Sequence, residues 1–110
     1  MRYEEVDQLM DSIGIPCAYR SFPKSTDKST PYLDYYYEGY DDFFADNKNY
    51  QKIAELRIEL YTDAKDEDSE AQVEEVLDQA EITYAKEEIY IEDEELFEII
   101  YESEVIINGQ

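Results

Sequence analysis

The side chains that could do chemistry in this chain are overwhelmingly carboxylates. Its 110 residues include 30 Asp and Glu, nine Lys and Arg, one Cys and no His, for a formal net charge of −21. Without histidine the chain lacks the most frequent general base and transition-metal ligand. A single cysteine, Cys17, excludes an internal disulfide and a thiolate metal cluster. Its apolar neighbours Ile15 and Ala18 favour a half-buried structural thiol.

The carboxylates form no recognisable catalytic or metal-binding motif. A paired-acid hydrolase is compatible with the residue types, but among thirty acids some lie close together by chance. Asp63, Asp66 and Asp68 lack the alternation and the turn glycine of a calcium loop. The three glycines stand alone at positions 14, 39 and 109, so there is no glycine-rich phosphate loop. We therefore expect no enzymatic activity, no catalytic residue, no cofactor and no metal ion.

The negative charge is concentrated in the second half of the chain. Residues 63–110 hold eighteen acids and only two bases, Lys65 and Lys86. Such a chain repels nucleic acid and anionic membranes, so we expect neither as a direct partner. The acids are compatible with a solvated face, with a negatively lined passage and with a surface for a basic partner. The longest apolar stretches are three residues and none follows the amino terminus, which predicts neither a membrane span nor a signal peptide.

Two segments show the apolar periodicity of helices. The first stripe, followed by Gly14 as the terminating residue, consists of Val6, Leu9, Met10 and Ile13. The second stripe consists of Val73, Val76, Leu77 and Ala80. Ser69 with Gln72 three residues later predicts a capping box at the start of the second helix.

The remaining apolar residues follow the period of strands. We expect strands at 17–22, 32–38, 50–61, 82–91 and 97–107, the fourth interrupted at 87–88 by a bulge or turn. Polar loops are expected at 23–31 and 40–49. Within 50–61 the alternation puts one row inward, Ala54, Leu56, Ile58 and Leu60. The opposite face would carry Glu55, Arg57, Glu59, Glu98, Glu102 and Glu104.

These elements predict an α+β fold in a single domain spanning 1–110. Each helix has one apolar stripe and the strands are amphipathic, so two layers are enough to bury them. We expect a two-layer sandwich of an antiparallel or mixed sheet of four to five strands, with both helices on one face.

The aromatic residues indicate a protein interface. Six of the twelve tyrosines cluster on and around 32–50, and alternation places Tyr36 on the face opposite the core, available to a partner. Phe43 and Phe44 stand in an otherwise polar segment, where they either pack on the core or dock on another protein. With the adjacent Asp41 and Asp42, these residues form the candidate interface.

Over most of its length, from Pro31 to Val105, the chain resembles the small tail-completion or tail-terminator proteins of long-tailed bacteriophages and prophages of Gram-positive bacteria. The resemblance is a pattern similarity and contains no metal-signature-like motif. It rests on an amino-terminal helix leading into Gly14-Ile15-Pro16, then Pro31-Tyr32-Leu33-Asp34-Tyr35-Tyr36-Tyr37, Phe43-Phe44-Ala45-Asp46-Asn47, Glu59-Leu60-Tyr61-Thr62, Glu74-Glu75-Val76-Leu77, Ile82-Thr83-Tyr84 and Ile99-Ile100-Tyr101-Glu102.

The resemblance implies a virion structural role at the head-proximal end of the tail. Before assembly the protein would be in the host cytoplasm. Such proteins form a ring, commonly a hexamer, which stops tube polymerisation and contacts the tail-tube and head-connector proteins. The isolated protein can stay monomeric until it meets its template. Loops such as 23–31 and 39–49 would order on assembly, and the acidic half would line the DNA passage.

A different class of function fits the same charge. A small acidic protein can act as a DNA mimic that occupies the DNA site of a host DNA-binding protein. Such a protein would bind a basic partner tightly and be displaced by salt or duplex DNA.

Overall fold

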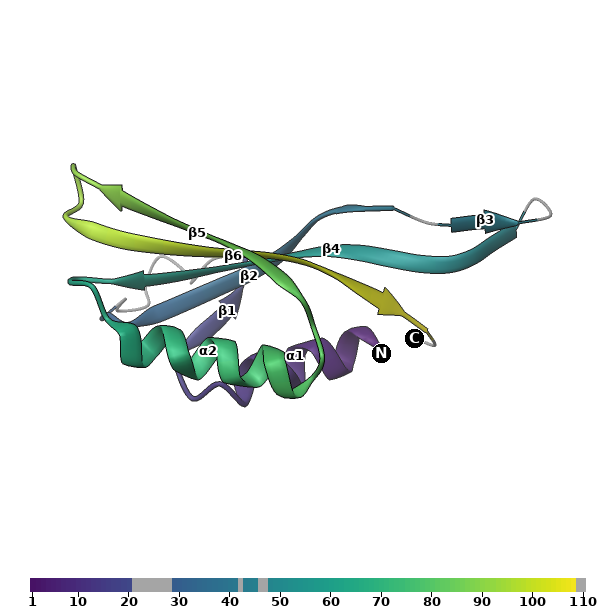
Figure 1. The fold of residues 1–110 in the computed structure, drawn as a ribbon, viewed down its shortest axis with the longest axis horizontal. Helices are drawn as coiled ribbons and strands as arrows, with labels where there is room; N and C mark the ends of the chain where they lie inside the picture. Colours follow the sequence, from purple (N-terminus) through teal and green to yellow (C-terminus); the bar gives the residue numbers. More distant parts are fainter. Residues whose placement is uncertain (21–28, 42, 46–47, 109–110) are drawn as a thin grey trace.

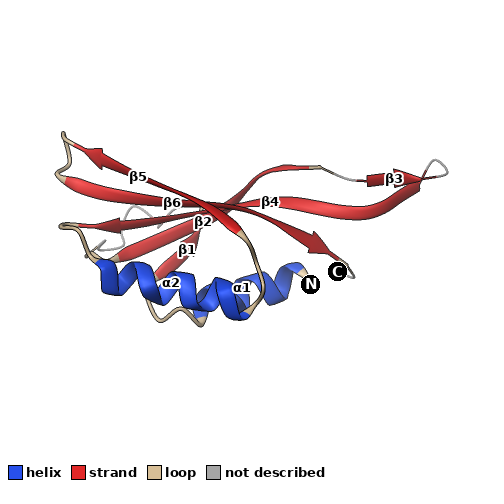
Figure 2. Cartoon of the chain, in the orientation of Figure 1, coloured by secondary structure: helices blue, strands red, loops and turns tan. Residues whose placement is uncertain are grey.

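The computed structural model describes residues 1–20, 29–41, 43–45 and 48–108. One twisted sheet forms the first layer, and two helices, α1 (Tyr3–Asp11) and α2 (Glu67–Gln79), form the second layer on one of its faces (Figures 1 and 2). The strands are β1 (Cys17–Tyr19), β2 (Tyr32–Tyr40), β3 (Phe43–Ala45), β4 (Lys48–Thr62), β5 (Tyr84–Ile91) and β6 (Leu96–Ile107). The predicted α+β architecture is confirmed.

The sheet is mixed, with strand order β1-β2-β4-β6-β5 and the short β3 pairing with β4 off that path. Only β1 runs parallel to its neighbour, and every other pair is antiparallel. The central pair, β4 with β6, is in continuous register from Lys52 opposite Ile107 to Thr62 opposite Phe97. A bulge between Tyr37 and Gly39 lets β2 continue to Tyr40, so Gly39 does not end the strand as its type suggests.

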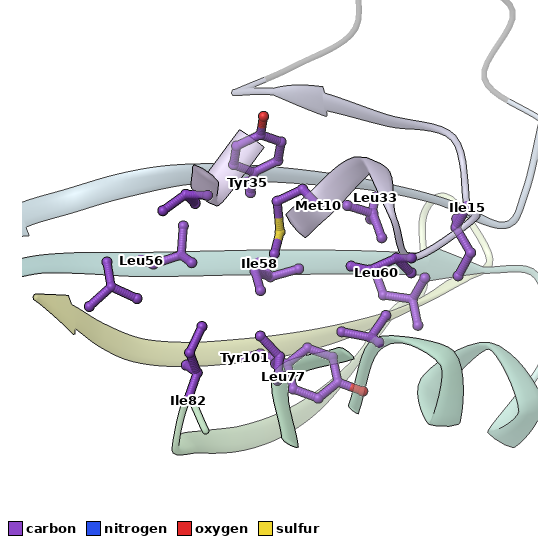
Figure 3. Packing of buried hydrophobic residues seen from close by; sticks show 14 of the residues in the cluster. Met10, Ile15, Leu33, Tyr35, Leu56, Ile58, Leu60, Leu77, Ile82 and Tyr101 are labelled. Carbon is purple, nitrogen blue, oxygen red and sulfur yellow. The ribbon is translucent and has the colours of Figure 1, made fainter. Parts of the chain in front are cut away.

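The core lies between the sheet and the helices and is built from the predicted inward rows. Figure 3 shows side chains from both helices and from the central strands meeting in one cluster. The inward row of β4 is completely buried. Each Leu or Ile side chain of this row contributes about 1.5–3 kcal/mol by leaving water. The members from the other elements include Val6, Met10, Val73, Leu77, Leu33, Tyr35, Ile99, Tyr101, Val105 and Ile107.

Both helices begin earlier in the chain than their apolar stripes suggest. Helix α1 ends at Asp11, and Ile13 is buried in the turn after it, before Gly14 takes a φ of +88°. The predicted capping box at Ser69 is wrong, because the N-cap of α2 is Asp66. Its carboxylate accepts hydrogen bonds from the Ser69 backbone N–H (3.1 Å) and hydroxyl (2.7 Å), so Ser69 lies inside the first turn.

Two predictions about the strands are also wrong. Residues 43–45 form β3 and pair with the start of β4, so the segment expected as a loop contains a hairpin ladder. Strand β5 runs without a bulge, because Glu87 and Glu88 pair in register with Ile100 and Ile99. Six of its residues around this point are exposed, and an edge strand tolerates charge where its side chains stay in water.

Candidate functional site

The face of the sheet opposite the helices carries the polar residues that could have a function. We call this surface the outer face. Its described members alternate with the core rows along β2, β4, β6 and β5: Tyr32, Asp34, Tyr36, Glu38, Glu55, Arg57, Glu59, Tyr61, Glu98, Ile100, Glu102, Glu104, Ala85, Glu87 and Ile89. Tyrosines and carboxylates dominate it, as the alternation predicted.

At the centre of the outer face two carboxyl groups lie side by side and are buried. Asp34 of β2 is directly opposite Glu59 of β4, with 9% and 8% of their surfaces exposed. Arg57 donates from Nε to Oε2 of Glu59 at 2.7 Å, and Tyr36 donates to the same oxygen at 3.3 Å. The Tyr61 hydroxyl lies 3.1 Å from Oε1 of Glu59. Glu59 is therefore surrounded by donors, as a buried carboxylate must be.

Asp34 has a different environment, which favours its neutral form. Burial, then its hydrogen bond with Glu59, raises the pKa of Asp34 to about 8. Burial opposes ionisation of Glu59 too, but hydrogen bonds from Asp34, Arg57 and Tyr61 hold its pKa below the usual value. Oδ1 of Asp34 is buried and accepts no hydrogen bond from a described residue. One proton held between the two carboxyls, on the Asp34 side, resolves the like-charge contact at neutral pH.

The network continues to the next strand. Oε2 of Glu98 on β6 lies 3.0 Å from the Tyr61 hydroxyl, and burial raises the pKa of Glu98. Two groups with separated pKa values can act as an acid and a base, but a general acid must come within hydrogen-bond distance of its substrate. Asp34 and Glu59 are more than nine-tenths buried. The arrangement instead fixes strand register, because a one-residue slip would move these carboxyls into the apolar core.

A second group of acids surrounds a hollow in another part of the outer face. Glu38, Glu55, Glu102 and Glu104 line a space of about 540 Å³ together with residues 83–85 and 103. Nη1 of Arg57 lies 3.6 Å from Oε2 of Glu38. Burial, then a hydrogen bond with Glu102, raises the pKa of Glu38. Among the described residues, no group of three or more Asp, Glu, Cys or His side chains is placed to hold a metal ion.

Of the predicted interface residues, the structure describes the side chains of Tyr36 and Asp41. Tyr36 is half-buried at the centre of the outer face, where the Arg20 guanidinium lies 4.9 Å from its ring centroid. Asp41 is exposed after β2 and its backbone N–H donates to the Ile53 carbonyl at 2.9 Å. Asp42 lies outside the described residues. Phe43 and Phe44 are on β3, and their side chains also lie outside what the structure describes.

The Asp34–Glu59 pair was missed from the sequence. Glu59 was expected on this face as a solvated acid, and Asp34 was not singled out at all. The available signal was an aspartate in the middle of a tyrosine-rich strand, a position that aspartate rarely occupies. This aspartate becomes informative only when the strand register is known, because the register places it opposite a second acid.

The hairpin formed by β3 and residues 48–51 of β4 extends beyond the rest of the sheet, and we call it the arm. Pairing of β4 with β6 starts at Lys52, and pairing with β2 starts at Ala54. Among the described strands, residues 48–51 therefore pair with β3 alone. In Figure 1 the arm points to the right, away from both helices. Its backbone therefore lies outside the part of the sheet that the two helices cover.

No protein-family model matches the chain, and no curated protein is significantly similar to it. In the described part of the chain, neither helix combines the length and the apolar character that crossing a bilayer requires. The candidate site therefore rests on the geometry of the outer face and the arm.

Proposed function

We propose that this protein is a virion structural subunit that acts by protein–protein contact, of the tail-completion kind found in long-tailed bacteriophages and prophages of Gram-positive bacteria. The observation that carries the proposal is the arm. A two-stranded ribbon is marginally stable by itself in water. A ribbon that extends past the core of its own chain gains most stability if it packs on another molecule.

In this proposal the subunits form a ring, commonly a hexamer, at the head-proximal end of the tail. The arm of each subunit contacts the next subunit or the tail-tube protein, and the opposite side of the ring contacts the head connector. The protein is made in the host cytoplasm, stays monomeric there, and joins the virion tail. Its action is steric, with no bond made or broken, so we propose no enzymatic activity and no cofactor.

The charge of the outer face is consistent with such a ring. Six Glu residues of that face come from β4 and β6 or from the adjacent end of β2: Glu38, Glu55, Glu59, Glu98, Glu102 and Glu104. If the outer face lines the lumen, its carboxylates repel the phosphate backbone and let DNA pass without sticking. The same face argues against direct binding of nucleic acid or an anionic membrane.

The test is complementation with a double substitution on the arm, Phe43→Ser with Phe44→Ser. We expect a folded monomer by circular dichroism but at least a tenfold loss of joined particles in electron micrographs. Tyr19→Ser is the control, because Tyr19 is an exposed aromatic residue on β1, a strand that does not pair with the arm. Normal joining in the double variant would refute the role of the arm. Loss of the native spectrum would instead assign both rings to the core.

A second candidate function, an acidic DNA mimic, is favoured by the rows of carboxylates on the outer face. Glu102 and Glu104 are exposed and adjacent in one row of β6, about 7 Å apart at the strand repeat. A mimic would bind a basic DNA-binding protein and be displaced by duplex DNA. A tail-completion protein captured from infected lysate should instead keep its tail partners when duplex DNA is added.

A further inference from the structure

Strand β5 is a long edge that the rest of the described chain leaves open. It pairs with β6 through all eight of its residues and is last in the strand order. In Figure 1 it forms the upper margin of the sheet. Every second residue of such a strand directs its backbone N–H and C=O away from its neighbour, toward solvent. These groups are a template for another strand.

Short contacts extend along other parts of the sheet margin. Beyond β5, the Met1 amino group donates to the Ile106 carbonyl at 3.1 Å and the Asn108 N–H donates to the Met1 carbonyl at 2.9 Å. At the opposite margin, β1 pairs with β2, and the Arg20 N–H donates to the Tyr35 carbonyl at 2.7 Å. The terminal strand β1 has only three residues, so β5, with eight, is the longer of the two edges.

Two devices that usually protect an edge strand, proline and a bulge, are missing from β5. It contains no proline and its register shows no bulge. Its one lysine, Lys86, is held toward α2 by Glu70 (2.8 Å) and Glu74 (2.6 Å). Glu88 is likewise paired with Lys65 at 2.7 Å. The charges on the helix side of β5 are satisfied within the molecule and do not repel an incoming strand.

On the outer face, by contrast, the acidic residues of and beside β5 form no ion pair with a described residue. It runs Ala85, Glu87, Ile89, with Glu102, Ile100 and Glu98 beside it on β6. None of the ion pairs between described residues includes Glu87, Glu102 or Glu104. The methyl side chain of Ala85 leaves Glu102 accessible from the edge, and Ile89 is 37% exposed. An added strand would meet acidic and apolar positions in alternation along this row.

We infer that the β5 edge accepts an extended segment of another protein as an additional strand, with lysine or arginine facing Glu87 and Glu102 and an apolar residue facing Ile89. Main-chain hydrogen bonds supply the general affinity and the alternate side chains supply specificity. A basic partner is chosen over a second copy because pairing of two β5 edges would bring two acidic outer-face rows together at close range. This inference rests on the proposed function, action through protein contact. It deepens that function by naming a second docking surface and the chemistry of its partner.

The probe is an eight-residue peptide, Thr-Lys-Thr-Lys-Thr-Ile-Thr-Ile, with blocked ends, whose two lysines and first isoleucine can face Ala85, Glu87 and Ile89 in that order. Its binding is measured by fluorescence anisotropy, and backbone amide exchange of residues 84–91 is followed by NMR. We expect exchange at alternate β5 residues to slow at least tenfold on saturation. A peptide with Glu in place of Lys should not bind measurably. A peptide N-methylated at alternate residues keeps its charge but cannot pair, so it should also fail to bind.

Substitutions on the protein separate this edge from general charge attraction. Glu87→Lys should weaken binding of the lysine peptide about tenfold, since it replaces an attraction with a repulsion at close range. Glu75→Lys makes the same change on the exposed side of α2 and should weaken binding less than about threefold. Equal losses in the two variants would overturn the inference, as would binding of the N-methylated peptide.

Two further outcomes are decisive. Concentration-dependent protection of β5 without peptide would identify a second copy as the occupant and overturn the basic partner. Peptide binding without slowed exchange in 84–91 would overturn strand addition. Failure of the peptide experiment leaves the arm and its complementation test untouched. Normal head–tail joining in the arm variant, with peptide binding intact, would refute the tail role alone.

Discussion

Replacing Asp34 by Asn should remove most of the pH dependence of stability between pH 5.0 and 7.5. Asp34 is buried against Glu59, and burial, then the hydrogen bond with Glu59, raises its pKa to about 8. In the unfolded chain an aspartate ionises near pH 3.9. Across this window the folded protein therefore holds one proton that the unfolded chain has released. An asparagine amide can donate to Glu59 without needing a proton from solvent.

The sign and size follow from proton linkage. Because the folded state binds more protons, the free energy of unfolding falls as the pH rises. The stability associated with neutral Asp34 is complete below pH 3.9 and is lost as the pH approaches about 8. Each pH unit costs about 1.4 kcal/mol for one proton, so the wild type should lose about 3 kcal/mol over this window at most. Glu59, whose pKa is lowered, stays ionised throughout and adds nothing to the slope.

The composition makes this measurement unusually clean. The chain has no histidine, so the side chain that normally titrates in this range is absent. Urea unfolding followed by circular dichroism, at half-unit pH steps and constant ionic strength, gives the slope directly. Asp41→Asn is the matched control, since it makes the same chemical change at an exposed position just after the same strand. We expect its slope to equal that of the wild type.

Two results would refute this reasoning. A wild-type free energy of unfolding that does not change between pH 5.0 and 7.5 would show that the pair holds no shared proton. An unchanged slope in Asp34→Asn would assign the titration to another group. The obvious candidate is Glu98, whose pKa burial also raises. At pH 7.5 the Asn variant should be more stable than the wild type by about 1–3 kcal/mol.

The remaining predictions concern three other positions. Glu70→Gln should lower the free energy of unfolding by about 1–3 kcal/mol at pH 7 in urea titrations: although burial opposes ionisation, Lys65 and Lys86 hold the pKa of Glu70 below its usual value. This stabilisation is lost as the pH falls through the folded pKa, so equal destabilisation at pH 7 and pH 2 would contradict it. Gly14→Ala should cost about 1 kcal/mol because φ is +88° there, and an unchanged thermal midpoint would disprove the strain. Burial raises the pKa of Cys17 to about 11, so iodoacetamide at pH 8 should alkylate it at least tenfold more slowly than free glutathione; equal rates would count against a protected thiol.

Much of the fold could be predicted because burial follows a local period. The row Ala54, Leu56, Ile58 and Leu60 was assigned to the core from alternation alone, and all four side chains are fully buried. The two helical stripes gave the second layer in the same way. The number of layers and the side of the sheet that the helices cover follow from which faces are apolar.

The errors arose where pairing overrides local preference. In the sequence alone, Glu87 and Glu88 look like a break in the strand, but continuous pairing with β6 keeps β5 unbroken. Residues 43–45 read as part of a polar loop until their partners at 48–51 are known. At α2, Asp66 captures both the N–H and the hydroxyl of Ser69, so the helix starts three residues earlier than the Ser69 pattern indicates.

By itself, the sequence determined the charge, the missing catalytic residue types and the division of each element into an apolar and a polar face, because these depend only on composition and on spacing within a segment. Only the tertiary structure decided that Asp34 meets Glu59, that the arm extends past the sheet and that β5 is an open edge. Each of these depends on strand register and strand order, which join residues distant in the chain and leave no periodic trace within either segment.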